Sequence, residues 1–283
     1  MLAFAFLTIP GTTVAQSLPD SIVQQVRAGT TSIVIPGDSV VVPLVGTPTL
    51  PLIEVFVNGV GPYRLLIDLG SNVTLLRRDV VDASRSVVLV DRPSSDIVLI
   101  DTLRVGEATL EKVTIASYDD LDVDGVLGYN VLQNSSFTFD MQHRRLVLHR
   151  RSLPAPDGTS IFPYQVHGRL PYIYVSLGKD SLLLNLDTGA TEVMTIPVQM
   201  QSHLRWVTPP KPGRSVFNNQ TGRIQVLEGH LIDTLRFGEL EIKSPLVYVN
   251  PDAEDAWLGA GALINTVWVF DPKQQRVQVT SFK

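Results

Sequence analysis

The 283-residue sequence contains no cysteine, which excludes disulfide bonds, thiolate metal ligands and a cysteine nucleophile. It also has no apolar run of about 18 residues, the length that a membrane-spanning helix needs. Its 23 Lys and Arg residues are scattered and its net charge is −5, so the basic stripe typical of nucleic-acid binding is missing. These absences leave a globular protein whose chemistry must rest on other side chains.

Helical periodicity is scarce as well. From Ser32 onward, short runs of Val, Ile and Leu are broken by Pro, Gly, Asp and Asn, a pattern typical of strands and turns. No segment of a dozen or more residues holds a convincing helical period. The sequence therefore predicts an all-β protein, and its length suits about two domains.

The first residues have features of an export signal. Residues 2–7 form a short apolar core, which Pro10 and Gly11 break, and small residues follow up to Ala15. This order is typical of a secretory signal, although no basic residue precedes the core. We expect residues 1–15 to be a signal peptide for a periplasmic or secreted protein; a buried first strand is the alternative. Residues 16–31 are polar and predict a short helix or an ordered arm.

An internal repeat organises the rest of the chain. Each copy has two prolines eight residues apart: Pro43 and Pro51 in the first copy, Pro163 and Pro171 in the second. An aspartate follows the second proline by 17 residues in one copy and 16 in the other: Asp68 and Asp187. Each aspartate ends an apolar run and enters a turn that contains glycine. The same passage therefore occurs twice.

The two copies align again downstream. Residues 101–107 match residues 233–239 at six of seven positions, and residues 124–128 then correspond to 255–259. We therefore predict a first repeat at residues 32–150, a linker at 151–158 and a second repeat at 159–283. Two repeats are too few for a solenoid, so they predict similar lobes related by a pseudo-twofold axis at which equivalent residues meet.

Under this symmetry Asp68 and Asp187 are the residues expected to meet. Two carboxylates a few ångströms apart cannot both ionise cheaply, so one keeps a proton while the other holds the charge. Such a pair can deprotonate a water molecule held between the carboxyl groups and protonate the leaving nitrogen of a peptide. The turn residues that would support the pair are Leu69, Gly70, Ser71, Thr188, Gly189 and Ala190.

These passages resemble those of bacterial retropepsin-like aspartyl proteases, in a duplicated, pepsin-like single-chain form. The likeness rests on residues 55–68 and 184–190, and on residues 126–128 and 257–259, which resemble the family's second, apolar-glycine signature. It implies two closed β lobes with a substrate cleft between them. It also implies that Asp68 and Asp187 are the catalytic pair of an aspartic endopeptidase that needs no metal or organic cofactor.

One residue departs from the family pattern. Leu69 stands where the family has Thr or Ser, whose hydroxyl makes buried hydrogen bonds across the lobe interface. Partner groups around Thr188 would then be left unsatisfied, at about 1–3 kcal/mol, unless Leu69 packs apolarly instead. This departure favours an alternative, a peptide-binding pseudoprotease without turnover. A purely structural β module remains a third interpretation.

The second repeat also has a longer hairpin region. Asp233 follows Asp187 by 46 residues, whereas Asp101 follows Asp68 by 33 residues in the first repeat. We interpret the polar turn in this extra length as the flap that closes over substrate; an ordinary exposed hairpin is the alternative. The predicted flap residues are Asn218, Asn219, Gln220, Thr221 and Gly222.

Metal-binding patterns are weak. Residues 120–125 fit the first half of a calcium loop, but its twelfth position is Val131 rather than Glu. The five histidines share no ligand spacing. We expect no metal, no cofactor and no nucleic-acid partner; the expected partner is a peptide or protein substrate, and the expected state is a monomer.

Overall fold

The computed structural model describes residues 18–91, 95–119, 121–218 and 222–281, so the predicted signal peptide lies outside the described residues. Strands dominate, and the helices are short: α1 (Asp20–Ala28), α2 (Arg78–Ala83), α3 (Tyr129–Leu132), α4 (Ala260–Leu263) and the 3-10 helix η2 (Val198–His203). In this part of the chain no helix is long and apolar enough to cross a membrane. The predicted all-β class is confirmed.

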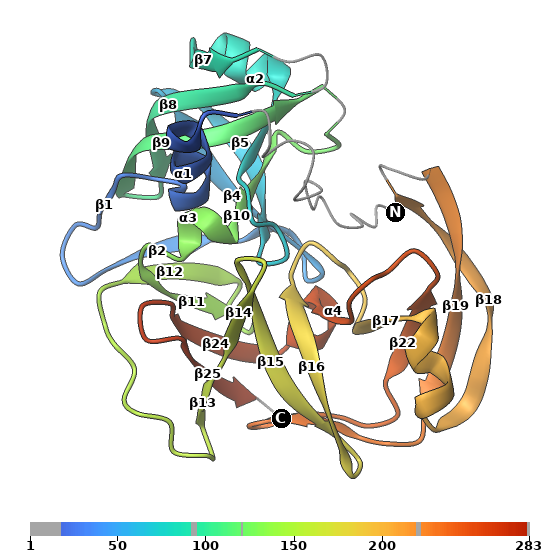
Figure 1. The fold of residues 1–283 in the computed structure, drawn as a ribbon. Helices are drawn as coiled ribbons and strands as arrows, with labels where there is room; N and C mark the ends of the chain where they lie inside the picture. The colour runs from blue at the N-terminus through green and yellow to red at the C-terminus, as the bar shows by residue number, and fades with distance from the viewer. Residues whose placement is uncertain (1–17, 92–94, 120, 219–221, 282–283) are drawn as a thin grey trace.

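The first repeat forms a nine-stranded sheet that closes into a barrel (Figure 1). Its strands are β1 (Ser32–Val34), β3 (Val45–Thr47), β4 (Leu50–Val57), β5 (Val60–Asp68), β6 (Leu75–Arg77), β7 (Val87–Val90), β8 (Ile97–Val105), β9 (Ala108–Tyr118) and β10 (Gly125–Gly128). Their order is β1-β9-β6-β10-β5-β4-β8-β7, and β8 also pairs with β9. This last pairing closes the ring.

The second repeat forms a ten-stranded sheet with the same internal order. Its strands are β14 (Gln165–His167), β15 (Leu170–Leu177), β16 (Asp180–Asp187), β17 (Met194–Pro197), β18 (Trp206–Asn218), β19 (Gly222–Leu231), β20 (Leu235–Phe237), β21 (Leu240–Ile242), β22 (Leu246–Asn250) and β23 (Trp257–Gly259). The counterpart of β8 is divided here into β19, which pairs with β22, and β20, which pairs with β15. The second lobe therefore closes by the same route as the first.

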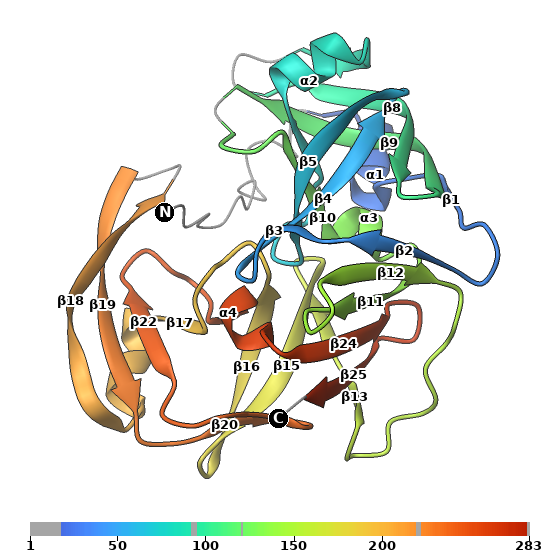
Figure 2. The same ribbon diagram turned by 180° about the vertical axis from the view of Figure 1, so that it is seen from behind.

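A third sheet of six strands joins the repeats (Figure 2). It contains β2 (Ser39–Pro43), β11 (Ser136–Asp140), β12 (Arg145–His149), β13 (Ile161–Pro163), β24 (Thr266–Asp271) and β25 (Arg276–Ser281). The order β13-β25-β24-β11-β12-β2 takes three strands from each repeat, and equivalent strands stand at equivalent distances from the centre.

The register at the centre of this sheet locates the pseudo-twofold axis. Strands β11 and β24 pair antiparallel, with Phe137 opposite Phe270, Thr138 opposite Val269, and Phe139 opposite Trp268. Because Phe139 and Phe270 are equivalent in the repeat, this pairing is symmetric about Thr138 and Val269. The predicted twofold relation of the two lobes is confirmed in the backbone register.

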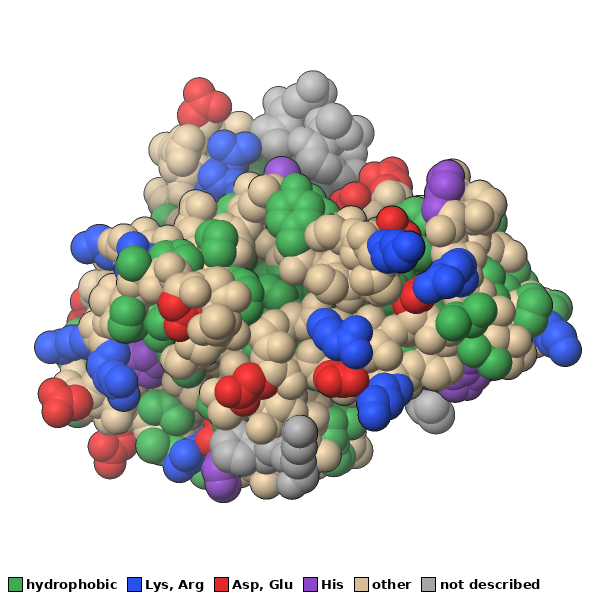
Figure 3. Space-filling view, turned by 90° about the horizontal axis from the view of Figure 1, so that it is seen from below, with side chains coloured by type: hydrophobic (Ala, Val, Ile, Leu, Met, Phe, Trp, Pro, Cys, Tyr) green, Lys and Arg blue, Asp and Glu red, His purple; other side chains and the backbone are tan. Residues whose placement is uncertain are grey.

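The core is continuous through both repeats. Strand β11 alternates, with Phe137 and Phe139 fully buried, whereas the ends of β5 and β16 are buried on both faces. Aromatic side chains fill the centre: the rings of Phe137 and Phe270 stack at 4.7 Å, and those of Phe237 and Trp268 at 5.5 Å. The contact of Phe137 with Phe270 joins the two repeats, whereas Phe237 and Trp268 both belong to the second. Acidic and basic side chains are interspersed on the face shown in Figure 3.

Candidate active site

The two aspartates occupy equivalent places in the two lobes. Asp68 ends β5 and lies beside Gly128 of the parallel strand β10; Asp187 ends β16 and lies beside Gly259 of β23. The apolar runs before them are buried, so each strand delivers its carboxyl group into the interior. The exposed fractions of the two residues are 8% and 3%.

The turns bring the two carboxyl groups together. A Cβ atom added to Gly70 would lie 2.6 Å from Cγ of Asp187, and one added to Gly189 would lie 2.7 Å from Oδ2 of Asp68. Each carboxyl group therefore rests on the glycine of the opposite turn, where a larger side chain has no room. The two carboxyl groups are also hydrogen-bonded to each other. The structure thus places the predicted pair side by side.

Backbone amides orient both carboxyl groups. The N–H of Gly70 donates to Oδ1 of Asp68 at 2.7 Å. In the second turn, the N–H groups of Gly189 and Ala190 donate to Oδ1 of Asp187 at 3.0 and 3.1 Å. One oxygen of each carboxyl group is therefore held by its own turn, which fixes the side-chain conformation.

Burial raises the pKa of both aspartates, and each carboxyl group also affects the pKa of the other. The pKa of Asp187 is raised well above its usual range by burial, and then by the charges of Asp68 and Glu192. Burial also raises the pKa of Asp68, while hydrogen bonds from Asp187 and from backbone amides lower it. Two buried carboxyl groups this close together cannot both ionise cheaply, so the pair shares one proton.

A single hydroxyl bridges the two turns. The N–H of Leu69 donates to Oγ1 of Thr188 at 3.0 Å, and the same hydroxyl donates to the carbonyl oxygen of Ile67 at 2.8 Å. Leu69 has no hydroxyl with which to return these bonds. It is fully buried and belongs to the main core cluster, so it packs apolarly. The bridge between the lobes is made from one side only.

Ser71 contributes through its backbone rather than through its hydroxyl. Its Oγ donates to the carbonyl oxygen of Val73 at 2.7 Å, which shapes the turn. Its amide is one of the donors that lower the pKa of Asp68. Its carbonyl oxygen accepts the N–H of Tyr129 at 2.8 Å, so the turn is tied to α3.

The predicted flap falls on a long hairpin formed by β18 and β19. Strand β18 has 13 residues, whereas β7, its counterpart in the first repeat, has four. Asn218 pairs with Gly222 at the end of the hairpin, and the three flap residues between them, 219–221, lie outside the described residues. In Figure 1 the hairpin extends beyond the other strands of its sheet. Closure over a substrate stays a prediction.

Sequence reasoning missed Glu192, which lies just after the second turn. Its side chain is 8% exposed and forms an ion pair with Arg214 at 3.1 Å. Its Oε1 accepts hydrogen bonds from Oγ1 of Thr195 at 2.9 Å and from Nε1 of Trp257 at 3.1 Å. The available signal was a charge at the position where the first repeat has Val73.

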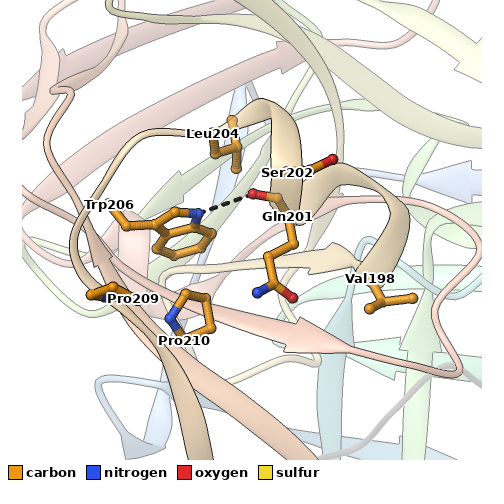
Figure 4. Close-up of a pocket in the computed structure, with 7 residues that line it drawn as sticks. All are labelled: Val198, Gln201, Ser202, Leu204, Trp206, Pro209 and Pro210. Carbon is orange, nitrogen blue, oxygen red and sulfur yellow. Dashed lines mark hydrogen bonds between the residues drawn. The ribbon is translucent and has the colours of Figure 1, made fainter.

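A pocket of about 400 Å³ lies between η2 and the start of β18. Figure 4 shows Trp206, Pro209 and Pro210 along one side and the Gln201 side chain on the other. The indole N–H of Trp206 donates to the carbonyl oxygen of Gln201 at 3.0 Å. None of the lining residues belongs to the two aspartate turns.

Asp124, in the acidic stretch before β10, makes contacts within the protein. Asp124 accepts the backbone N–H of Arg64 at 2.8 Å and forms an ion pair with Arg77 at 2.9 Å. Within the described ranges, no three His, Asp or Glu side chains are grouped closely enough to hold a metal ion.

The chain is similar in structure to proteins of the aspartic protease fold. An aspartic proteinase from Irpex lacteus matches with a TM-score of 0.53 and 16% identity, over 87% of this chain and 98% of that one. Basic 7S globulin from soybean matches at 0.48 and 13% identity, over 88% and 96% of the two chains. Conglutin gamma, a basic 7S globulin from lupine seeds, matches at 0.49 and 11%, over 87% and 95%.

Sequence comparison adds no relative. No protein-family model matches the chain. No curated protein matches it either. At these identities the structural likeness defines the fold, and the chain has the aspartic protease fold.

Proposed function

We propose that this protein is an aspartic endopeptidase that hydrolyses peptide bonds with a water molecule activated by Asp68 and Asp187. The observation that carries the proposal is the buried pair of carboxyl groups, hydrogen-bonded to each other in equivalent glycine turns. The fold shared with an aspartic proteinase supports it. A pair that holds one proton can act as base and acid at once.

The proposed reaction uses each carboxyl group in turn. The Asp68 carboxylate takes a proton from water while the water oxygen attacks the peptide carbonyl carbon, and Asp187 gives its proton to the carbonyl oxygen. In the resulting diol, Asp68 passes its new proton to the nitrogen while Asp187 recovers one from a hydroxyl group. The carbon–nitrogen bond then breaks, and the pair again holds one proton on Asp187.

The finer assignments rest on sequence features. We propose that the β18–β19 hairpin is the flap, because the second repeat has the longer hairpin. Membership of the retropepsin-like family, export guided by residues 1–15, and a monomeric state belong to the same proposal. The substrate would be a peptide or protein, as the resemblance to aspartyl proteases implies.

Leu69 favours a second candidate, a pseudoprotease that binds peptides without cleaving them. The hydroxyl bridge between the turns is made by Thr188 alone, because Leu69 cannot make the reciprocal bonds. A bridge from one side constrains the separation of the carboxyl groups less tightly than two bridges would. Turnover would then be weak or absent while binding persists.

Cleavage of a mixed peptide library by protein that starts at Gln16 tests the proposal. We expect cleavage between acidic and neutral pH, abolished in Asp187→Asn. The matched control is Asp101→Asn, which changes an exposed aspartate paired with Lys112 and should leave cleavage intact. Absence of cleavage at every pH would contradict the proposed endopeptidase activity. Binding of a pepstatin-like inhibitor would then support the pseudoprotease, and absence of binding would leave a structural β module.

A further inference from the structure

The Glu192 side chain is a meeting point of several elements of the second lobe. Its carboxylate accepts hydrogen bonds from Thr195 on β17 and Trp257 on β23, and pairs with Arg214 on β18. Its backbone is held as well, because its carbonyl oxygen accepts the N–H of Gly261 in α4 at 3.0 Å. A buried carboxylate with this many partners has one defined position.

Arg214 connects the β18–β19 hairpin to Glu192. Its guanidinium group lies 4.3 Å from the centre of the Tyr248 ring on β22 and 3.1 Å from Oε2 of Glu192. Its backbone N–H donates to Oε1 of Glu228 on β19 at 2.8 Å. About a quarter of the side chain is exposed, so the ion pair is largely shielded from water. One side chain therefore joins β18, β22 and the segment that follows the second aspartate turn.

The described residues of the first repeat show no such arrangement. The position equivalent to Glu192 is Val73, which is buried among apolar side chains, and the hairpin strand equivalent to β18 is only four residues long. The contact is therefore an addition peculiar to the second lobe, which also contains Asp187, whose pKa is raised well above its usual range.

We infer that Arg214 is a positioning residue: through Glu192 it fastens the β18–β19 hairpin to the Asp187 turn and neutralises the buried charge beside that aspartate. This inference rests on the proposed function for its kinetic consequences. It does not rest on it for its electrostatic ones, because the ion pair exists whether or not the protein cleaves peptides.

The electrostatic argument concerns the ionisable groups around Asp187. Asp68 faces it from the opposite turn, and Glu192 follows it in the chain; both negative charges oppose its ionisation. Arg214 balances Glu192, while Glu228 and Tyr248 are the other titratable groups beside Arg214. Removing Arg214 leaves Glu192 uncompensated, so Asp187 should keep its proton to higher pH. Removing the charge of Glu192 should have the opposite effect.

The test compares Arg214→Met with Glu192→Gln in the pH dependence of peptide cleavage. We expect the basic limb of the activity profile to move to higher pH in the first variant and to lower pH in the second, each by about half a pH unit or more. The double variant should lie near the wild type because the net charge is restored. Arg214→Lys, which keeps the charge, should restore the wild-type limb.

The control is Arg236→Met, which removes an exposed arginine paired with Glu241 in the same lobe and should not move the limb. NMR titration of carboxyl-labelled aspartate gives the same comparison without activity, using the Asp187→Asn spectrum for assignment. An inactive protein whose Asp187 titration moves in opposite directions would refute the proposed function and keep this inference. Shifts in one direction, or none in the near-isosteric Glu192→Gln, would overturn the inference.

Discussion

The two aspartate turns have the same backbone design but different surroundings. In the first repeat the turn is flanked by Leu69 and Val73, both buried and apolar. In the second, the equivalent positions hold Thr188 and Glu192, and both make polar contacts across element boundaries. Both turns nevertheless present a buried carboxyl group to the axis. The position of the pair is symmetric, and its bracing is not.

The first repeat has its own support, built from the N-terminal arm. Helix α1 packs beside α3, where Nδ2 of Asn130 donates to the carbonyl oxygen of Val26 at 2.9 Å. Oγ1 of Thr74 donates to Oδ1 of Asn130 at 2.9 Å and accepts the N–H of Gly128 at 3.1 Å. The two lobes therefore support equivalent aspartates by different means: an added helix in one, and an ion pair to the hairpin in the other.

The largest expected effect is a loss of kcat, and it should be equal for the aspartates of the two lobes. Asp68→Asn and Asp187→Asn should each reduce kcat by about a thousandfold or more, because either change destroys the shared-proton pair. The double variant should be scarcely worse than either single variant, since the two residues act as a unit. Steady-state kinetics on one cleaved peptide measures this. Multiplicative losses would show that the aspartates act independently.

A smaller effect, on stability, should follow from removing the hydroxyl bridge between the two turns. Thr188→Val removes the only hydroxyl that bridges them and leaves the amide of Leu69 and the carbonyl of Ile67 without their partner. We expect the free energy of unfolding to fall by about 1–3 kcal/mol, measured by urea denaturation. Thr102→Val, on the exposed surface of β8, is the matched control. Equal, small effects of both changes would mean that the bridge does not brace the lobes.

The pH dependence of stability should report the raised pKa of Asp187. The pKa of Asp187 is raised in the folded protein, so its contribution to stability is complete below its unfolded pKa and is lost as pH rises through the folded one. Asp187→Asn cannot ionise and escapes this loss. It should therefore gain stability relative to the wild type toward neutral pH, on the order of 1 kcal/mol, and show no such gain in acid. A pH-independent difference would contradict a raised pKa of Asp187.

The smallest expected effect is that of a substitution which makes the first turn more like the second. Leu69→Thr loses apolar burial but regains a hydroxyl that can return the bonds made by Thr188. These terms oppose each other, so the free energy of unfolding should stay equal or rise by less than about 1 kcal/mol. Turnover should stay equal or rise. A clear loss of both thermal midpoint and turnover would show that Leu69 is a required apolar plug.

Much of the fold could be predicted because the duplication is visible as matching residues at equal spacings in the two repeats. Phe139 follows Gly128 by the same number of residues as Phe270 follows Gly259. This equal spacing predicts a twofold relation, which the register of β11 and β24 confirms. Apolar runs that end at Asp68 and Asp187 predict buried carboxyl groups, because a strand with no polar face is covered on both sides.

Other contacts could not be predicted because they depend on where distant strands cross. Arg214 meets Glu192 where β18 shifts its pairing with β19 between Pro212 and Ser215. The prolines and the glycine at 209–213 indicate an irregular strand, but they do not indicate which distant side chain it meets. The Ser71 hydroxyl turns to Val73 rather than to Asp68, a choice made by local geometry. The support that α1 gives to Asn130 likewise joins residues 104 positions apart.

The pH–rate profile of kcat/KM tests most directly whether Asp68 and Asp187 work as one shared-proton pair. The buried pair should give a bell whose optimum lies on the acidic side of neutral, with the acidic limb reporting addition of a second proton and the basic limb loss of the shared one. Because burial and the charge of Asp68 raise the pKa of Asp187, the basic limb should lie well above the titration of an ordinary aspartate. Activity that rises through a single limb to a plateau, or that persists in Asp187→Asn, would contradict the shared-proton mechanism.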